Sequence, residues 1–272
     1  MLTTRTYRGN QYNNYKKAEI LTTGDEPLDL VWKMYGEGGN DTLIGANFND
    51  SIYGGTGNDS LSGSLGSDRI YGESGNDRLF GEVGNDSLYG SSGDDYLSGG
   101  SGDDYLAAGS GDDILLSGSG NDRIYGNSGD DYLAAESGDD YLSGGSGTDN
   151  LIGGDGRDLL IGYGYTDSEY DVLTGNGVTQ TDNQADTFVL GATFYTGPNE
   201  NFSSVFYQGL GYASITDFSS LEGDKLRVVG SQSDYSLTIF DRNTVIAYQG
   251  DWIAIAENNT DLSLERDFEF LG

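Results

Sequence analysis

The chain has 272 residues, 45 of them glycine, and a formal net charge of -32 from 45 acidic and 13 basic residues. This balance excludes binding to nucleic-acid phosphates or anionic membranes, because both contacts need lysine and arginine. Cysteine and histidine do not occur, which excludes disulfides, thiolate metal sites, the usual zinc ligand and the usual catalytic base. The obvious partner of so acidic a surface is a cation.

Residues 1–35 differ from the rest of the chain in charge. They contain no apolar stretch typical of a secretory signal peptide, and we expect no transmembrane segment anywhere in the chain. Two interpretations remain open for this segment. It forms a cap in which Val31, Trp32 and Met34 cover the core that follows, or an arm that pairs with a neighbouring subunit. Five of the thirteen cations lie here: Arg5, Arg8, Lys16, Lys17 and Lys33.

Residues 36–161 consist of fourteen consecutive units of nine residues, since 14 × 9 = 126. Position eight is always Leu or Ile, and position four is Gly in every unit but one, where Phe48 replaces it. Position one is Gly except at Ala108, Ser117 and Ala135. Position six is always aspartate: Asp41, Asp50, Asp59, Asp68, Asp77, Asp86, Asp95, Asp104, Asp113, Asp122, Asp131, Asp140, Asp149 and Asp158.

Each unit predicts a glycine-rich turn followed by a three-residue strand at positions seven to nine. Side chains alternate along a strand, so only the Leu or Ile at position eight points inward. One such strand cannot bury its apolar face alone, whereas two facing strands form a coil of eighteen residues. Stacked coils then give two parallel sheets around a thin core, which is an all-β solenoid.

The pattern resembles the RTX (repeats-in-toxin) calcium-binding nonapeptide, G-G-x-G-x-D-x-U-x, over residues 36–161. The resemblance implies a right-handed parallel β-roll in which Ca²⁺ lies between the turns of successive coils. It also implies that the position-six aspartates are the metal ligands, together with turn carbonyls. Position two departs from the pattern, because Glu37, Glu73, Glu82 and Glu136 stand where Gly is typical. We expect such turns to hold calcium less well.

Electrostatics supports the same expectation. Coils place alternate aspartates in two columns, with neighbours about 4.8 Å apart. Two like charges at that distance repel by roughly 3 kcal/mol at an effective dielectric constant of 20. Residues 36–161 carry 20 Asp, 4 Glu and 4 Arg, a net charge of -20. Two columns with six gaps each predict up to about twelve Ca²⁺, of extracellular-type affinity, and a chain that is largely unfolded without them.

Other acidic or glycine-rich motifs fit less well. A solvated linker has no strict period, collagen needs a period of three with abundant proline, and a phosphate-binding loop precedes a helix. Asp167, Glu169 and Asp171 suggest an EF-hand, but Val172 and Val178 stand where Gly and Glu are needed. We interpret this segment as a distorted fifteenth unit, with Asp171 as a further metal ligand.

Residues 162–272 are expected to form an antiparallel β cap on the roll, with Trp252 and Phe218 in its core. The segment 182–191 is interpreted as a decayed repeat, in which Asp186 and Phe188 keep the acidic and apolar roles. The segment 213–230 resembles the region that follows RTX rolls. The resemblance implies type I secretion with an uncleaved C-terminal signal, to which the final residues "DFEFLG" could belong.

The outward positions predict an aromatic stripe along one sheet, which is either a consequence of β-propensity or a lateral contact surface. We expect no catalytic activity, since no domain or nucleophile constellation remains once roll, cap and arm are assigned. The leading hypothesis is a secreted, calcium-dependent structural protein that self-associates, head-to-tail or laterally, into an extracellular filament or surface layer. The alternative is a monomeric calcium-binding adhesin, matrix or ion-buffer module. The stripe consists of Tyr53, Tyr71, Tyr89, Tyr105, Tyr125 and Tyr141.

Overall fold

The computed structural model describes residues 3–17, 22–23, 26–27, 30–162, 170–175, 186–189, 192–194, 203–205, 212–215, 224–229, 231–240, 242–248, 251–256, 259 and 261–271. The chain divides into two compact units, Met1–Ala135 and Glu136–Gly272. The described residues are almost entirely strands and turns, with one short 3-10 segment, η1 (Gln232–Asp234). None of their helices is long and apolar enough to span a bilayer.

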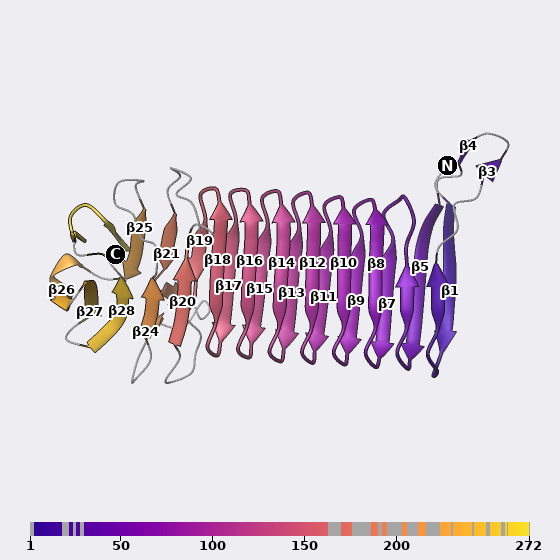
Figure 1. Ribbon diagram of the computed structural model, residues 1–272, viewed down its shortest axis with the longest axis horizontal. Helices are drawn as coiled ribbons and strands as arrows, with labels where there is room; N and C mark the ends of the chain where they lie inside the picture. Colours follow the sequence, from indigo (N-terminus) through magenta and orange to yellow (C-terminus); the bar gives the residue numbers. More distant parts are fainter. Residues whose placement is uncertain are drawn as a thin grey trace. The chain divides into compact units, whose positions relative to one another are not determined.

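The first unit contains two parallel sheets, to which successive strands contribute alternately (Figure 1). Each coil therefore supplies one strand to each sheet, as the repeat predicts. One sheet has the order β1 (Thr3–Asn10), β5 (Leu30–Gly38), β7 (Ser51–Thr56), β9 (Arg69–Ser74), β11 (Ser87–Ser92), β13 (Tyr105–Ser110) and β15 (Arg123–Ser128). The other has the order β2 (Tyr15–Lys17), β6 (Thr42–Ile44), β8 (Ser60–Leu65), β10 (Arg78–Val83), β12 (Tyr96–Ser101), β14 (Ile114–Ser119) and β16 (Tyr132–Ser137).

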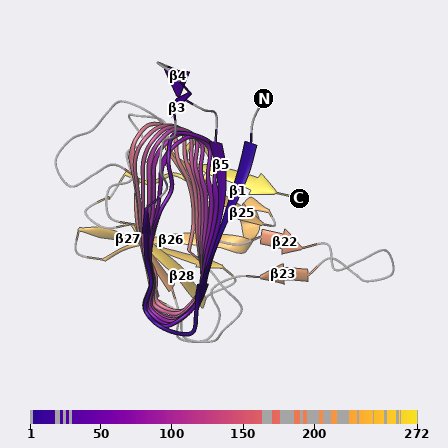
Figure 2. The same ribbon diagram turned by 90° about the vertical axis from the view of Figure 1, so that its right-hand side faces the viewer.

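Successive coils pair in register at a spacing of eighteen residues. Leu97 in β12 lies opposite Leu79 in β10 and Leu115 in β14. Viewed along the stack, the coils of this unit superpose as a flattened loop with two long sides (Figure 2). The strands from β7 to β15 have six residues, more than the three expected. Pairing continues through positions one to three of the next unit, so only positions four to six form the turn.

The Leu and Ile side chains at position eight form the core of the first unit, as predicted. Each of these side chains stacks on its counterpart in the neighbouring coil, and burying one contributes about 1.5–3 kcal/mol. Only one inward side chain per strand is large, so the core is thin for a chain so rich in glycine, which is costly to order. The fully buried residues at this position are Leu43, Ile52, Leu61, Ile70, Leu79, Leu88, Leu97, Leu106, Leu115, Ile124 and Leu133.

Residues 3–17 form the first coil of the stack. β1 pairs in parallel with β5, and β2 pairs in parallel with β6, so these strands lie against their own chain, as in the cap interpretation. Met34 is fully buried opposite Ile52, and Trp32 is buried beside it. The nine-residue register thus extends back beyond Gly36, and Trp32 and Asn14 occupy position six. A short hairpin, β3 (Thr22–Thr23) and β4 (Glu26–Pro27), interrupts this register.

The second unit shows that parallel pairing continues past residue 161, where we expected an antiparallel cap to begin. Leu173 in β20 lies opposite Leu151 in β18, and Phe188 in β21 lies opposite Leu160 in β19. The decayed units still place a buried apolar residue two positions after a buried aspartate, so they pair as the regular units do. The strands concerned are β17 (Tyr141–Ser146), β18 (Asn150–Asp155), β19 (Leu159–Ile161), β20 (Tyr170–Thr174), β21 (Thr187–Val189), β24 (Tyr212–Ile215), β25 (Lys225–Val229) and β29 (Phe268–Leu271).

A small antiparallel sheet is confirmed near the C-terminus. It contains β26 (Tyr235–Phe240), β27 (Asn243–Tyr248) and β28 (Asp251–Ala256). A two-stranded antiparallel ribbon, β22 (Ala192–Phe194) and β23 (Ser203–Val205), precedes it. Tyr235 contacts the rings of Tyr248 and Phe268, with centroids 5.2 and 6.1 Å away. The expected core roles of Trp252 and Phe218 lie outside the described side chains.

A ladder of tyrosine rings covers the outer face of one sheet of the first unit. Its first four rings stack with centroids 4.8–4.9 Å apart and planes within 7° of parallel. The next contacts are tilted, at 5.4–5.6 Å, because Tyr105 occupies position seven instead of nine. The predicted stripe is confirmed within this unit and begins one coil earlier than expected; Tyr141 lies in the second unit. The ladder consists of Tyr35, Tyr53, Tyr71, Tyr89, Tyr105 and Tyr125.

Candidate cation-binding columns

The repeat aspartates of the first unit form two buried columns, one at each turn edge. Within a column, the backbone N–H of each aspartate donates to Oδ1 of the aspartate in the next coil. The N–H of Asp59 donates to Asp77, and that of Asp77 to Asp95, each at 2.7 Å. One column contains Asp41, Asp59, Asp77, Asp95, Asp113 and Asp131, the other Asp50, Asp68, Asp86, Asp104 and Asp122, and none is more than 3% exposed.

The second oxygen of most of these carboxylates is buried without a hydrogen-bond donor. Leaving such an atom unsatisfied is costly, and ionising it there is costlier still. Burial therefore raises the pKa of Asp59 and Asp95 to about 7 and that of Asp68 to about 8, against the backbone N–H bond that lowers it. These carboxylates require either protons or a cation. Oδ2 has no partner in Asp41, Asp59, Asp68, Asp77, Asp86, Asp95, Asp104 and Asp113.

Glycine at position one lets the backbone approach the unpaired oxygen closely in every unit of this set except that of Asp113, which begins with Ala108. A Cβ atom on Gly72 would lie 2.3 Å from Oδ2 of Asp77 and 2.9 Å from the carbonyl oxygen of Gly90 in the next coil. A carboxylate and a carbonyl oxygen thus converge on a point that a larger residue would fill. Oxygen ligands of these two kinds are those that Ca²⁺ prefers, so the donor set fits a hard cation.

Backbone carbonyls would supply most of the ligands at such a site. Within the described part of the chain, no three acidic side chains gather around one point. Glu37, Glu73, Glu82, Ser91 and Asn127, all at position two, have φ between 75° and 85°. These five residues keep the left-handed backbone that glycine has at position two of other turns, such as Gly55 and Gly100. A left-handed backbone strains a residue that has a side chain, at a cost of about 1 kcal/mol each.

Asp50 has an environment different from that of the other column members. Its Oδ1 accepts a hydrogen bond from the backbone N–H of Trp32 at 2.6 Å, and its Oδ2 accepts one from Ala46 at 2.8 Å. Its turn carries Ala46 and Phe48 where most turns have residues with left-handed backbone, so a backbone N–H faces the carboxylate. Both oxygens of this predicted ligand are therefore already satisfied.

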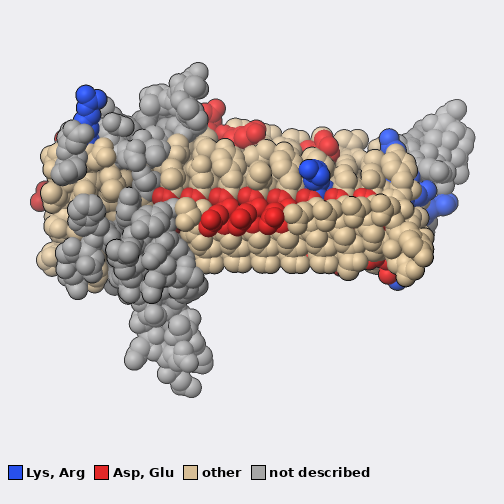
Figure 3. Space-filling view, turned by 60° about the horizontal axis from the view of Figure 1, so that its bottom comes forward, with Lys and Arg blue, Asp and Glu red and all other residues tan. Residues whose placement is uncertain are grey.

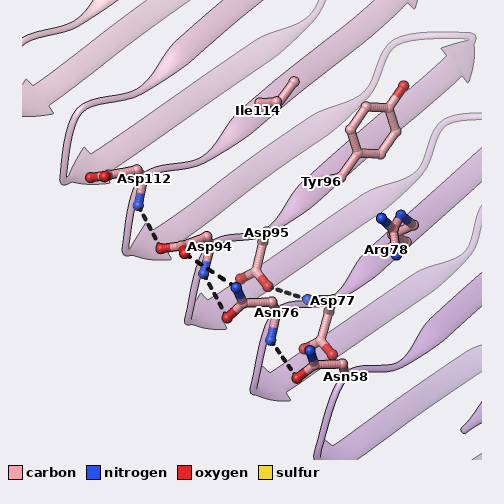
Figure 4. Close-up of a pocket in the computed structure, with 9 residues that line it drawn as sticks. All are labelled: Asn58, Asn76, Asp77, Arg78, Asp94, Asp95, Tyr96, Asp112 and Ile114. Atoms are coloured by element: carbon pink, nitrogen blue, oxygen red, sulfur yellow. Dashed lines mark hydrogen bonds between the residues drawn. The ribbon is translucent and has the colours of Figure 1, made fainter. Parts of the chain in front are cut away.

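A second column lies on the surface, one residue before the buried one (Figure 4). Its side-chain oxygens accept the backbone N–H of the next coil, at 3.1–3.2 Å. Its exposed carboxylates contribute to the row of acidic side chains along the coils in Figure 3. A groove of about 410 Å³ is lined by this column and by Arg78, Tyr96 and Ile114 on the strands. The part of the column beside this groove contains Asn58, Asn76, Asp94 and Asp112.

The columns of the second unit include aspartates outside the fourteen regular units. Asp171 and Asp186 are buried, and each accepts the backbone N–H of the preceding aspartate in its column at 2.9 Å. These are the positions expected for them. Asp224 continues the same pattern, accepting the N–H of Asp186 at 3.0 Å. The nine-residue period does not reveal Asp224, although the Asp-Lys-Leu sequence at 224–226 keeps the Asp-x-Leu step.

The match to a protein-family model agrees with this geometry. Residues 35–164 match the model of the RTX calcium-binding nonapeptide repeat in six segments, the first five of which overlap. No curated protein sequence gives a significant match. Among solved structures, the chain is similar to the extracellular lipase LipA from Serratia marcescens, at 20% identity and a TM-score of 0.37 over 84% of this chain. The match spans 39% of the lipase. Residues 35–164 of the chain belong to the family of RTX calcium-binding nonapeptide repeats.

Proposed function

We propose that this chain is a secreted structural protein that folds around Ca²⁺ and assembles into an extracellular filament or surface layer. The buried columns are the observation that carries the calcium part of this proposal. The proposed ligands are the column aspartates with an unpaired Oδ2, together with the turn carbonyls in front of them. Bound Ca²⁺ would supply the positive charge that these oxygens lack. Asp50, both of whose oxygens accept backbone N–H groups, is outside this set.

Dependence on calcium supports a role outside the cell. The columns oppose folding when they are ionised and empty, so the chain would remain extended where free Ca²⁺ is scarce. Carbonyl-rich sites of this kind suit affinities of roughly 10⁻⁴–10⁻³ M, which extracellular Ca²⁺ saturates. RTX repeats are typical of proteins exported by type I secretion, which passes unfolded chains. We propose this route for the present chain.

Two features support assembly over a catalytic role. β1 and β2 end their sheets within the described residues, so their outer edges offer unpaired backbone groups to another chain. The first coil also carries Arg5, Arg8, Lys16 and Lys17, whereas the turns farther along are acidic. Such a charge difference favours head-to-tail contact between copies. We propose that the chain itself is not an enzyme, since it has neither histidine nor cysteine to act as a general base or nucleophile.

Sedimentation velocity and negative-stain electron microscopy, with millimolar Ca²⁺ and after its removal, test the proposal. We expect extended assemblies with Ca²⁺ and unfolded monomers without it. Lys17→Glu in the first coil should weaken head-to-tail assembly, whereas Arg78→Glu on the side of the roll, a matched charge reversal, should not. A folded monomer at high protein concentration with Ca²⁺ would contradict assembly and leave a calcium-binding adhesin, matrix or ion-buffer module.

A further inference from the structure

The first coil carries an asparagine where the later coils of the same edge carry aspartate. Asn14 occupies position six, and its backbone N–H donates to Oδ1 of Asp41 at 2.5 Å. The N–H of Asp41 donates to Asp59 in the same way at 2.6 Å. Asn14 is therefore the first member of this column, with a neutral amide in place of a carboxylate.

The side-chain amide of Asn14 bridges the gap between the first two coils. Its nitrogen lies among oxygen atoms from both of them, two from its own turn and two from the next. Nδ2 is 2.5 Å from the carbonyl oxygen of Tyr12, 3.2 Å from that of Asn10, 3.3 Å from that of Gly36 and 2.8 Å from Oδ1 of Asp41. The amide thus donates to oxygens that belong to the turn backbone and to the next column member.

In the next coil, a carboxylate oxygen occupies the equivalent place. A Cβ on Gly9 would lie 2.3 Å from the carbonyl oxygen of Gly36 and 2.9 Å from Nδ2 of Asn14. A Cβ on Gly36 would lie 2.3 Å from the carbonyl oxygen of Gly54 and 2.2 Å from Oδ2 of Asp41. An N–H group donates to the facing carbonyl, whereas the carboxylate oxygen Oδ2 of Asp41 adds a second acceptor beside it and has no donor of its own.

We infer that the amide of Asn14 replaces the cation in the first gap of this column, so that the first coil joins the second without calcium. The inference rests on the proposed calcium binding and goes beyond it, because it assigns a gap that binds no ion. On the opposite edge, Oδ2 of Asp50 accepts the N–H of Ala46 in its own turn, so this position also lacks the unpaired oxygen of the later coils. The N-terminal end of the roll is thus a calcium-independent cap.

Asn14→Asp should convert this gap into an additional calcium site. The exchange places a carboxylate oxygen against the carbonyls of Asn10, Tyr12 and Gly36, as in the later coils. Bound Ca²⁺ per full-length chain is measured by equilibrium dialysis at millimolar Ca²⁺ and atomic emission. We expect about one ion more for Asn14→Asp than for the wild type. Asn40→Asp, which adds the same charge to the exposed column, serves as the control and should leave the count unchanged.

The reverse exchange tests the same idea at a regular coil. Asp77→Asn introduces an amide at a column position with an unpaired Oδ2, and should remove about one bound ion per chain. Circular dichroism with Ca²⁺ checks that each variant folds. If Asn14→Asp does not fold, the ion count of Asp77→Asn decides the test. An unchanged ion count in the folded variants overturns the inference. A wild-type chain that binds no Ca²⁺ overturns the proposed function instead.

Discussion

Removal of calcium should make the stability of this protein strongly dependent on pH, because protons are the remaining means of neutralising the columns. Desolvation is the main cause of the raised pKa values, and neighbouring aspartates add to it in most of them. The pKa is raised from 3.8 to about 8 in Asp68, about 7 in Asp59, Asp95 and Asp104, and about 6 in Asp77. Between about pH 4 and pH 8, the native state therefore binds more protons than the unfolded chain.

The sign of the dependence follows directly. Stability falls with rising pH wherever the native state binds more protons, so calcium-free protein is most stable in mild acid and loses stability toward pH 8. One pKa unit corresponds to about 1.4 kcal/mol, but water at the turns and coupling along the columns reduce this figure. About 1 kcal/mol per aspartate gives roughly 5–10 kcal/mol for the first unit, which is comparable with the whole stability of a domain.

The assay uses protein stripped of metal on a chelating resin, since soluble chelators weaken in acid. Far-UV circular dichroism and thermal melts from about pH 5 to pH 8 should show sheet in acid and its loss toward neutrality. Millimolar Ca²⁺ should abolish this dependence above about pH 6, because the carboxylates are then neutralised by the ion. Equal sheet content and equal melting temperature at both ends of the range, in metal-free protein, would refute the reasoning.

Three further predictions concern the calcium-loaded protein and are measured by chemical or thermal unfolding. Leu97→Ala removes a fully buried core side chain and should lower the free energy of unfolding by about 2–4 kcal/mol. Ser98→Ala on the outer face is the control and should change it by less than about 0.5 kcal/mol. Similar losses of stability in the two variants would contradict the core assignment. Tyr71→Ala removes two ring stacks and should cost about 1–3 kcal/mol, and no loss would show that the ladder is not stabilising. Gly75→Ala should destabilise by more than about 2 kcal/mol, since φ is 125° and its Cβ would lie 2.1 Å from a backbone oxygen. Glu73→Gly, at φ 75°, should instead stabilise by about 0.5–1 kcal/mol, and the opposite order of these two would refute the strain argument.

The regular repeat carries enough information to predict most of the first unit. An aspartate and an apolar residue recur at every ninth position, so the coil length, the core residues and the membership of the columns follow from periodicity alone. The position of Tyr105 could likewise be foreseen, but not the tilt of its ring, which depends on contact with its neighbours. The six-residue length of the strands could not be foreseen either, because pairing through positions one to three is a property of adjacent coils.

The ends of the repeat were harder to predict, because insertions break the spacing while the pairing survives. Column neighbours are eighteen residues apart in the regular coils, but 28 apart between Asp158 and Asp186 and 38 apart between Asp186 and Asp224. A period cannot be followed across loops of unequal length, so parallel pairing there becomes visible only in the folded chain.

The sequence by itself determined that residues 36–161 form stacked coils with columns of aspartates, because each nine-residue unit offers one apolar side chain that a single strand cannot bury alone. The tertiary structure decided which column positions lack a donor. The amide of Asn14 reaches Asp41 in the next coil, and Asp50 accepts the N–H of Ala46 in its own turn, so both contacts depend on the direction of individual peptide and amide groups. That direction is set by the backbone of the stacked turns, which residue identity alone does not specify.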